Sequence, residues 1–277
     1  MLAKVCISGL SAVGKTFVSK SVTRIIDAKR LSASTILLDY GLALGYESFY
    51  PSDRKQHFWF DQKAIRFSAQ RLADTRLDRM VDQLLLSYAE KSKRVVFDSL
   101  SIPALWPQTN PCFSVLLVAN PEIRTARAWV SSDNIPLDEI KEGLAVKDKT
   151  TRNILLNSWG FDILSQDYLD RFDLVIDNSS FDDIANIRRF EKQSKQKTLD
   201  IISTAISLYR IAIGDNEKQT KREGELLRYF QELVYHYPAV ILRVPKQFIG
   251  TIKNFNSTRW EVREHVWLKN CDSHKMG

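Results

Sequence analysis

The chain has 277 residues, of which 44% are hydrophobic and 26% charged, and these proportions exclude a disordered or fibrous protein. This length suits one sizeable domain and a smaller one. Residues 191–277 carry +5 of the net charge of +7, a surplus that would suit nucleic acid, an anionic substrate, an acidic protein partner or simply a solvated surface. No run of eighteen apolar residues occurs, which predicts a cytoplasmic protein with no membrane span.

Short β-branched and aliphatic runs alternate with helical stretches in the first 190 residues. Continuous apolar strands need cover on both faces, which favours a parallel sheet flanked by helices and therefore the α/β class. A helical spacing of apolar residues predicts one long helix over 61–91. The five predicted strands lie at 5–8, 35–39, 94–98, 113–119 and 172–177.

A polar stretch at 191–197 predicts a domain boundary at about residue 190, which divides the chain into domains 1–190 and 191–277. A helix is expected to begin after residue 180 and to continue past Arg188. The C-terminal extension is predicted to be helical or α+β, and it would either dock on the core or offer a surface to a protein or nucleic-acid partner. Its expected elements are helices over 199–213 and 224–237 and strands over 239–244 and 260–268.

The most informative segment is GLSAVGKT at residues 9–16, which matches the phosphate-loop pattern GxxxxGK[ST] between a predicted strand and a predicted helix. Small residues let the backbone wrap around an anion, and the helix that follows directs its positive end toward the same anion. Lys15 would reach the β- and γ-phosphates of ATP, and the Thr16 hydroxyl would bind Mg²⁺. The remaining predicted cofactor-binding residues of the loop are Gly9, Ser11, Ala12 and Gly14.

Two aspartates close predicted strands, and the carboxyl ends of parallel strands open on a ligand crevice. Asp98 is the better Mg²⁺ ligand, with a cap of the following turn as its structural alternative. Asp39 would either cap a turn or contact the acceptor.

Two basic clusters could stabilise a phosphoryl group in transfer, because positive charge is needed as that group moves. One consists of Arg124 and Arg127, and the other of Lys147, Lys149 and Arg152. A solvated helix face explains either cluster equally well.

Taken in order, these segments resemble the short, archaeal-type branch of the cytidylate-kinase-like nucleoside monophosphate kinases over about residues 3–188. The resemblance implies a P-loop kinase fold with a five-stranded core, an acceptor-binding region over 40–92 and a mobile lid over 130–158. It matches Arg127 to a lid-side arginine and places Lys147 and Arg152 in or next to the basic positions of the lid. Besides the loop, it is carried by DTRLDRMV at 74–81, VVFD at 95–98, NPEIRTAR at 120–127, WGFD at 159–162 and FDLVIDNS at 172–179.

The chain also departs from that family. Ser99 and Leu100 stand where the family usually has Gly-Arg, so an arginine that grips phosphate is missing, and Lys147 replaces an arginine. Lysine and arginine are not equivalent at a bidentate phosphate contact.

Three functions fit these observations. The first is ATP- and Mg²⁺-dependent transfer of a phosphoryl group to a nucleotide such as CMP or dCMP, with Lys15, Asp98 and Arg127 in the catalytic site. The second is transfer to a hydroxyl of a small molecule or RNA, with Asp39 as the base. The third is a non-catalytic ATP-binding module that recruits a partner through residues 191–277.

Overall fold

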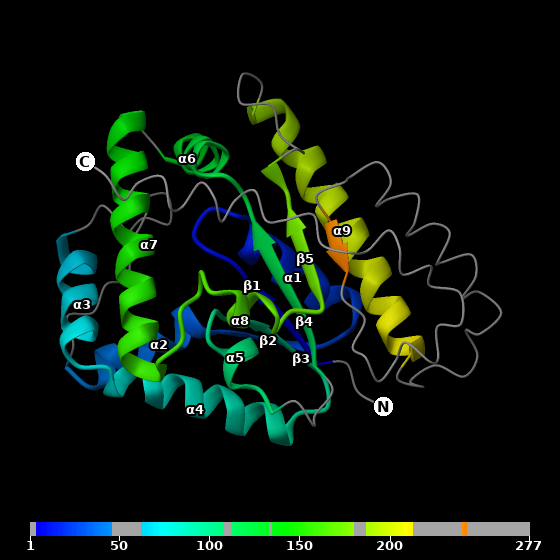
Figure 1. The fold of residues 1–277 in the computed structure, drawn as a ribbon, viewed down its shortest axis with the longest axis horizontal. Coiled ribbons are helices and arrows are strands. Elements are labelled where there is room, and N and C mark those ends of the chain that lie inside the picture. Colours follow the sequence, from blue (N-terminus) through cyan, green and yellow to red (C-terminus); the bar gives the residue numbers. More distant parts are fainter. Residues whose placement is uncertain are drawn as a thin grey trace.

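A central sheet with helices on both faces organises the chain in the computed structural model, which describes residues 4–45, 62–107, 112–132, 135–179, 187–212 and 240–242 (Figure 1). Within these ranges, no helix is long and apolar enough to cross a membrane. The strands are β1 (Lys4–Ser8), β2 (Lys29–Ser32), β3 (Val95–Asp98), β4 (Phe113–Val118), β5 (Leu174–Asp177) and β6 (Val240–Leu242). The helices are α1 (Lys15–Ile25), α2 (Ala33–Ala43), α3 (Gln62–Ala73), α4 (Arg76–Lys91), α5 (Ile102–Leu105), α6 (Pro121–Val130), α7 (Leu137–Trp159), α8 (Gln166–Leu169) and α9 (Ile187–Ala212).

The sheet has the strand order β2-β3-β1-β4-β5-β6. The first five strands are parallel, and β6 pairs antiparallel with β5. Val5 of β1 lies opposite Val96 of β3 on one side and Phe113 of β4 on the other. The chain therefore leaves β1 between two neighbouring strands, and a crevice forms at such a point in an open parallel sheet. This arrangement confirms the predicted α/β fold with a five-stranded parallel core.

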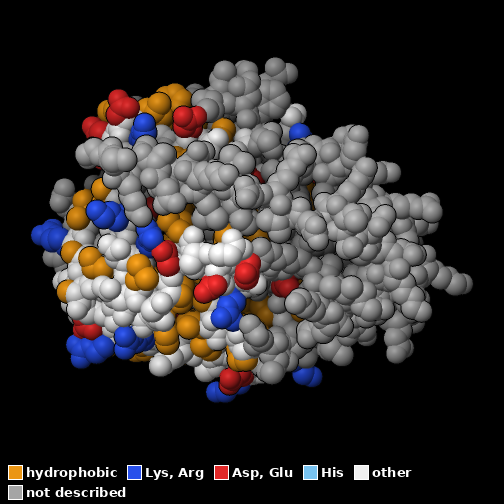
Figure 2. Space-filling view, viewed as in Figure 1, with side chains coloured by type: hydrophobic (Ala, Val, Ile, Leu, Met, Phe, Trp, Pro, Cys, Tyr) orange, Lys and Arg blue, Asp and Glu red, His pale blue; other side chains and the backbone are white. Residues whose placement is uncertain are grey.

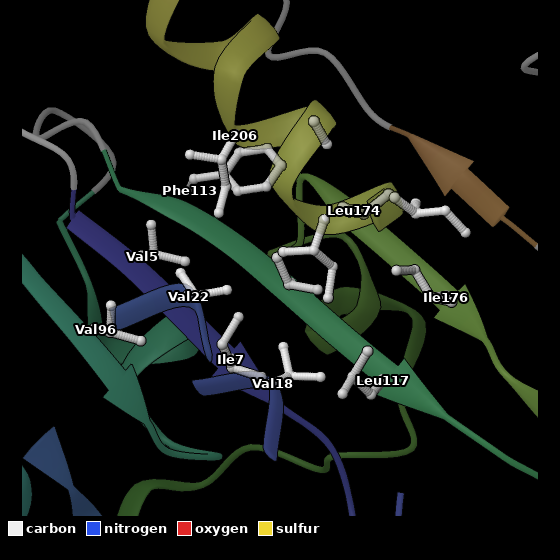
Figure 3. Packing of buried hydrophobic residues seen from close by; sticks show 14 of the residues in the cluster. Val5, Ile7, Val18, Val22, Val96, Phe113, Leu117, Leu174, Ile176 and Ile206 are labelled. Carbon is white, nitrogen blue, oxygen red and sulfur yellow. The ribbon is translucent and has the colours of Figure 1, made fainter. Parts of the chain in front are cut away.

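Alternate residues of the strands face two different hydrophobic layers. Val5 and Ile7 of β1 pack with residues of α1 and α9, whereas Cys6 between them packs with α4 on the opposite face. Figure 3 shows the first layer, in which Val18 and Val22 of α1 meet side chains of the central strands. Burial on both faces explains why these strands read as continuous apolar runs.

The second strand and the long helix differ from the sequence-based expectation. Residues 35–39 belong to helix α2, and β2 is the preceding segment Lys29–Ser32. A short apolar run does not by itself distinguish a strand from a buried helix, and two basic residues in β2 weaken its strand signal. The predicted helix 61–91 is two helices, α3 and α4, and at the break between them Asp74 accepts a hydrogen bond from the backbone N–H of Arg76 (3.0 Å). Such a local hydrogen bond competes with a continuous helix.

Helix α9 runs through residue 190, where the sequence predicts a domain boundary. Four of its residues, Ile201, Ile202, Ala205 and Ile206, are buried in the layer that also contains α1. Strand β6 lies within the predicted strand 239–244, while the predicted helix 224–237 and strand 260–268 fall outside the described residues. The first part of the C-terminal region therefore completes the core, and the division into two domains stays a prediction.

Candidate phosphate-binding site

The loop between β1 and α1 has a backbone that favours small residues at three of its positions. Gly9 has φ 141°, and a Cβ atom there would overlap the carbonyl oxygen of Leu117 and lie 2.8 Å from Cγ2 of Val13. Ala12 (φ 62°) and Gly14 (φ 96°) are both left-handed, and Gly14 is the N-cap of α1. The loop thus delivers the chain into a helix whose first N–H groups have no partner within the helix, which is the geometry of an anion site.

Lys15 and Thr16 occupy the first turn of α1, as the sequence predicts. The ammonium group of Lys15 donates a hydrogen bond to the carbonyl oxygen of Leu10 (2.7 Å), so the side chain folds back over the loop. Burial lowers the pKa of Lys15. Thr16 is exposed. An anion bound above the loop would favour the charged form of Lys15 and so raise its pKa again.

The loop lies at the base of a cavity of about 660 Å³. The part of its lining that comes from α6, the end of β5 and α9 is called the β4-side wall, and it comprises Arg127, Ala128, Ser131, Asn178, Ser194, Lys195 and Thr198. The part from α2, α3, α4 and the segment after β3 is called the β3-side wall, and it comprises Ala33, Ser34, Leu37, Leu38, Phe67, Arg71, Asp78, Val81, Asp82, Ser99, Leu100 and Ser101. Helix α7 closes the cavity with Lys147, Asp148, Thr151, Ile154 and Leu155.

Asp98 ends β3 beside the loop, where it is buried and lines the cavity. Its Oδ2 atom accepts hydrogen bonds from Nη2 of Arg30 (2.6 Å) and from Oγ of Ser19 (3.3 Å), and Ser19 lies one turn after Thr16 on α1. Mg²⁺ typically binds one or two protein oxygens together with phosphate oxygens and water. The hydroxyl of Thr16 and the carboxylate of Asp98 form a donor set that fits this ion. Among the described residues, no group of three or more His, Cys, Asp or Glu side chains could hold a metal without such help.

Both arginines of α6 are buried, with exposed fractions of 6% for Arg124 and 8% for Arg127, so the solvated-face interpretation of this cluster is wrong. Arg124 donates to the backbone oxygen of Ser11 in the loop (3.0 Å) and pairs with Asp148 of α7. Arg127 donates to the side-chain oxygen of Asn178 (2.8 Å) and to its backbone oxygen (3.0 Å). Arg124 therefore supports the loop from its outer side, whereas Arg127 lines the cavity.

The residues of the second basic cluster all lie on helix α7 but have different surroundings. This helix runs continuously through most of the segment expected to form a lid. Lys147 faces the cavity, and burial together with nearby Lys15 lowers the pKa of Lys147 to about 7. Lys149 is exposed. Arg152 pairs with Asp162 and is not among the described residues that line the cavity. The structure thus brings Lys147 to the loop and directs Arg152 elsewhere.

Asp39 does not occupy the position that the sequence suggests. It is exposed on α2 and is not among the described cavity-lining residues, because the segment predicted as a strand is helical. The carboxylates on that side of the cavity are instead Asp78 and Asp82 of α4.

Asp82 is the residue that sequence reasoning missed most clearly. It accepts hydrogen bonds from Nε1 of Trp159 (2.8 Å) and from Oγ of Ser101. Burial raises the pKa of Asp82 to about 6, although both hydrogen bonds favour the carboxylate. The only sequence signal was indirect, since Trp159 belongs to the segment WGFD at 159–162.

No protein-family model matches the chain. Solved structures of an uncharacterized protein from Eubacterium ventriosum and of TT1252 from Thermus thermophilus align over 72% and 53% of this chain and 99% and 79% of theirs, with TM-scores of 0.40 and 0.35 and identities of 13% and 15%.

The curated relatives are cytidylate kinases. That of Pyrobaculum neutrophilum is 24% identical over 175 residues, which cover 63% of this chain and 83% of the relative. For Pyrobaculum calidifontis the identity is 24% over 205 residues, with coverages of 73% and 94%. The relative from Archaeoglobus fulgidus is 24% identical over 179 residues, with coverages of 65% and 87%. The chain is thus a distant homologue of archaeal cytidylate kinases, which supports a kinase-like enzyme of the nucleotide-kinase type.

Proposed function

We propose that the chain is an ATP- and Mg²⁺-dependent phosphotransferase. The observation that carries this proposal is the meeting of four groups at one cavity: the Gly9–Thr16 loop, the carboxylate of Asp98, and the cations Arg127 and Lys147. Phosphoryl transfer depends chiefly on positioning and on stabilising charge, and these groups supply both.

The loop N–H groups and Lys15 would hold the β- and γ-phosphates of ATP. Thr16 and Asp98 would hold Mg²⁺, which neutralises phosphate charge when bound. Lys147 would approach the γ-phosphoryl group from α7, because it already lies close enough to Lys15 for the two charges to repel. The β4-side wall would take the nucleoside of ATP, and the β3-side wall would take the acceptor.

The acceptor has two candidate classes. The curated relatives are named for cytidylate, so a nucleotide such as CMP or dCMP is the first. The second is a hydroxyl compound, and it is favoured by Leu100, an apolar residue that lines the acceptor wall directly after Ser99. The residues of each wall, rather than the loop, must discriminate between these classes.

The test is release of ADP from Mg·ATP by the full chain with a panel of nucleotides and nucleosides. We expect acceptor-dependent release that Lys15→Ala abolishes. Lys20→Ala is the matched control, because Lys20 lies on the same helix but is exposed and outside the described cavity lining. Equal activity in the wild type and Lys15→Ala would contradict the proposal, and binding of ATP without any transfer would favour a non-catalytic module.

A further inference from the structure

We propose that the acceptor is an uncharged nucleoside that receives the phosphoryl group on a ribose hydroxyl, and not a nucleoside monophosphate. This inference rests on the proposed phosphotransferase function and specifies the substrate class of the same cavity. It is argued from the charge, the apolar surface and the hydrogen-bonding groups of the β3-side wall.

The charge of the β3-side wall is the first argument. Arg71 is the one cationic residue among its described members. Its Nε and Nη2 atoms bond to the two carboxylate oxygens of Asp78 at 3.1 and 2.5 Å, so its charge is already compensated. Asp82 adds a second carboxylate. The described residues of the wall thus have a net charge of −1 when both aspartates are ionised, and a phosphate monoester would bring about two further negative charges at neutral pH.

The apolar part of the wall is the second argument. Leu37, Phe67 and Val81 line it, and Leu100 lies two residues after the end of β3. Ile154 and Leu155 of α7 add further apolar surface. Apolar walls with a few fixed polar groups are typical of sites that bind ring-containing small molecules. These apolar residues provide contact area for a base and sugar, and they offer no charge to a phosphate.

The fixed polar groups offer a means of reading such a ligand. The Arg71–Asp78 pair has a further contact, since the Arg71 guanidinium lies 5.6 Å from the centre of the Phe67 ring. A guanidinium beside a carboxylate presents both donors and acceptors, which suits the edge of a nucleobase. Removing a phosphate from the acceptor therefore leaves a ligand that this wall can recognise.

A hydroxyl acceptor requires a group that takes its proton. Asp98 is held by Arg30 and Asp78 by Arg71, whereas the hydrogen-bond partners of Asp82 are the neutral groups of Ser101 and Trp159. In the proposed step, the hydroxyl oxygen bonds to the γ-phosphorus as the bond from phosphorus to the bridging oxygen breaks. ADP leaves with the electron pair of that bond, and the proton of the hydroxyl passes to the carboxylate of Asp82.

The experiment compares matched pairs with the full chain and Mg·ATP: cytidine with CMP, uridine with UMP, adenosine with AMP, and guanosine with GMP, together with the deoxy forms. We expect at least one nucleoside to exceed its own monophosphate in kcat/KM by about 100-fold or more, because placing like charges together in a binding site is strongly unfavourable. Higher kcat/KM with the monophosphates would overturn the inference while supporting the phosphotransferase. Failure of every nucleoside in a chain that binds Mg·ATP would also overturn it, whereas failure to bind Mg·ATP would refute the proposed function itself.

Two variants separate the role of Asp82 from that of the Arg71–Asp78 pair. Asp82→Asn should lower kcat for the nucleoside by about 100-fold or more, because a general base is lost, while KM changes little. Asp78→Asn should mainly raise KM, since it disturbs the Arg71 pair that reads the ligand. Asp167→Asn, at an exposed position on α8, is the control. Melting temperatures of all three variants report folding, and a folded Asp82→Asn protein with unchanged kcat would remove the base from the proposal.

Discussion

Arg30 and Asp98 form an ion pair of 2.6 Å between neighbouring strands of the sheet, and this pair holds the carboxylate next to the phosphate loop. Nε of Arg30 also donates to Ser19 (2.8 Å), which itself donates to Asp98. The aspartate is therefore fixed in position before any metal binds, and such preorganisation is what a site that orients Mg²⁺ requires.

Replacing Asp98 by asparagine should reduce Mg²⁺-dependent activity by about 100-fold or more, since one metal ligand and its charge are lost. Nucleotide affinity measured without metal should change by less than tenfold. Titration of the nucleotide with and without Mg²⁺ gives the comparison. Equal losses of affinity and activity under both conditions would assign Asp98 to structural support of Arg30 alone.

The backbone of the loop predicts a large difference between two glycine variants. Gly160→Ala should cost about 1–2 kcal/mol of unfolding free energy, because Gly160 is left-handed (φ 75°) but open to solvent space. Gly9→Ala should cost more and also weaken ATP binding, because its Cβ would collide with the backbone of Leu117. Denaturant unfolding and nucleotide titration check both variants. Similar costs at the two positions would contradict the close approach of the loop to β4.

The lowered pKa of Lys147 predicts how the affinity for ATP depends on pH. Its pKa of about 7 in the free protein means that it loses its proton near neutrality. Bound phosphate favours the charged lysine and raises this pKa, so binding takes up a proton above pH 7. Affinity should therefore be greatest below pH 7 and fall as the pH rises toward 9. Calorimetry in buffers of different ionisation enthalpy measures the proton uptake.

The control for that pH dependence is Lys147→Arg, because arginine stays charged throughout this range. The variant should bind ATP with a flatter pH profile and with a smaller proton uptake. A profile identical to that of the wild type would assign the titration to another group.

The packing of α9 predicts that the chain depends on residues beyond 190. Ile206 is buried in the layer between α9 and the sheet (Figure 3), and Ile206→Ala should cost about 2–4 kcal/mol of unfolding free energy. Ile25→Ala on α1 is the control, since Ile25 is 53% exposed and should change the stability by less than about 0.5 kcal/mol. Equal melting temperatures for the two variants would mean that α9 does not contribute to the core.

The sequence predicts the phosphate loop, Asp98 and the two arginines of α6 because each follows a strongly apolar strand. It does not predict Arg30, because β2 is short and half basic, or Asp82, whose partner Trp159 lies 77 residues away. Such contacts depend on how α4 and α7 pack against each other, and local sequence patterns do not indicate that packing. The same limit explains Arg152, which belongs to a basic run but pairs with Asp162.

Recruitment of a protein or nucleic acid through residues 191–277 stays a prediction of the sequence. Figure 2 shows basic and acidic side chains interspersed over the described part of one face, and no patch of a single sign gathers there. Nucleic-acid binding by the full chain would be recognised by an affinity that falls steeply with salt.

The measurement that tests the central claim most directly follows the label of γ-³²P-ATP into the acceptor. We predict a labelled acceptor formed one-to-one with ADP by the wild-type chain in the presence of Mg²⁺, and its loss in Lys15→Ala with Lys20→Ala unaffected. Label that never leaves ATP, although the chain binds the nucleotide, or label transferred equally by Lys15→Ala, would contradict the account.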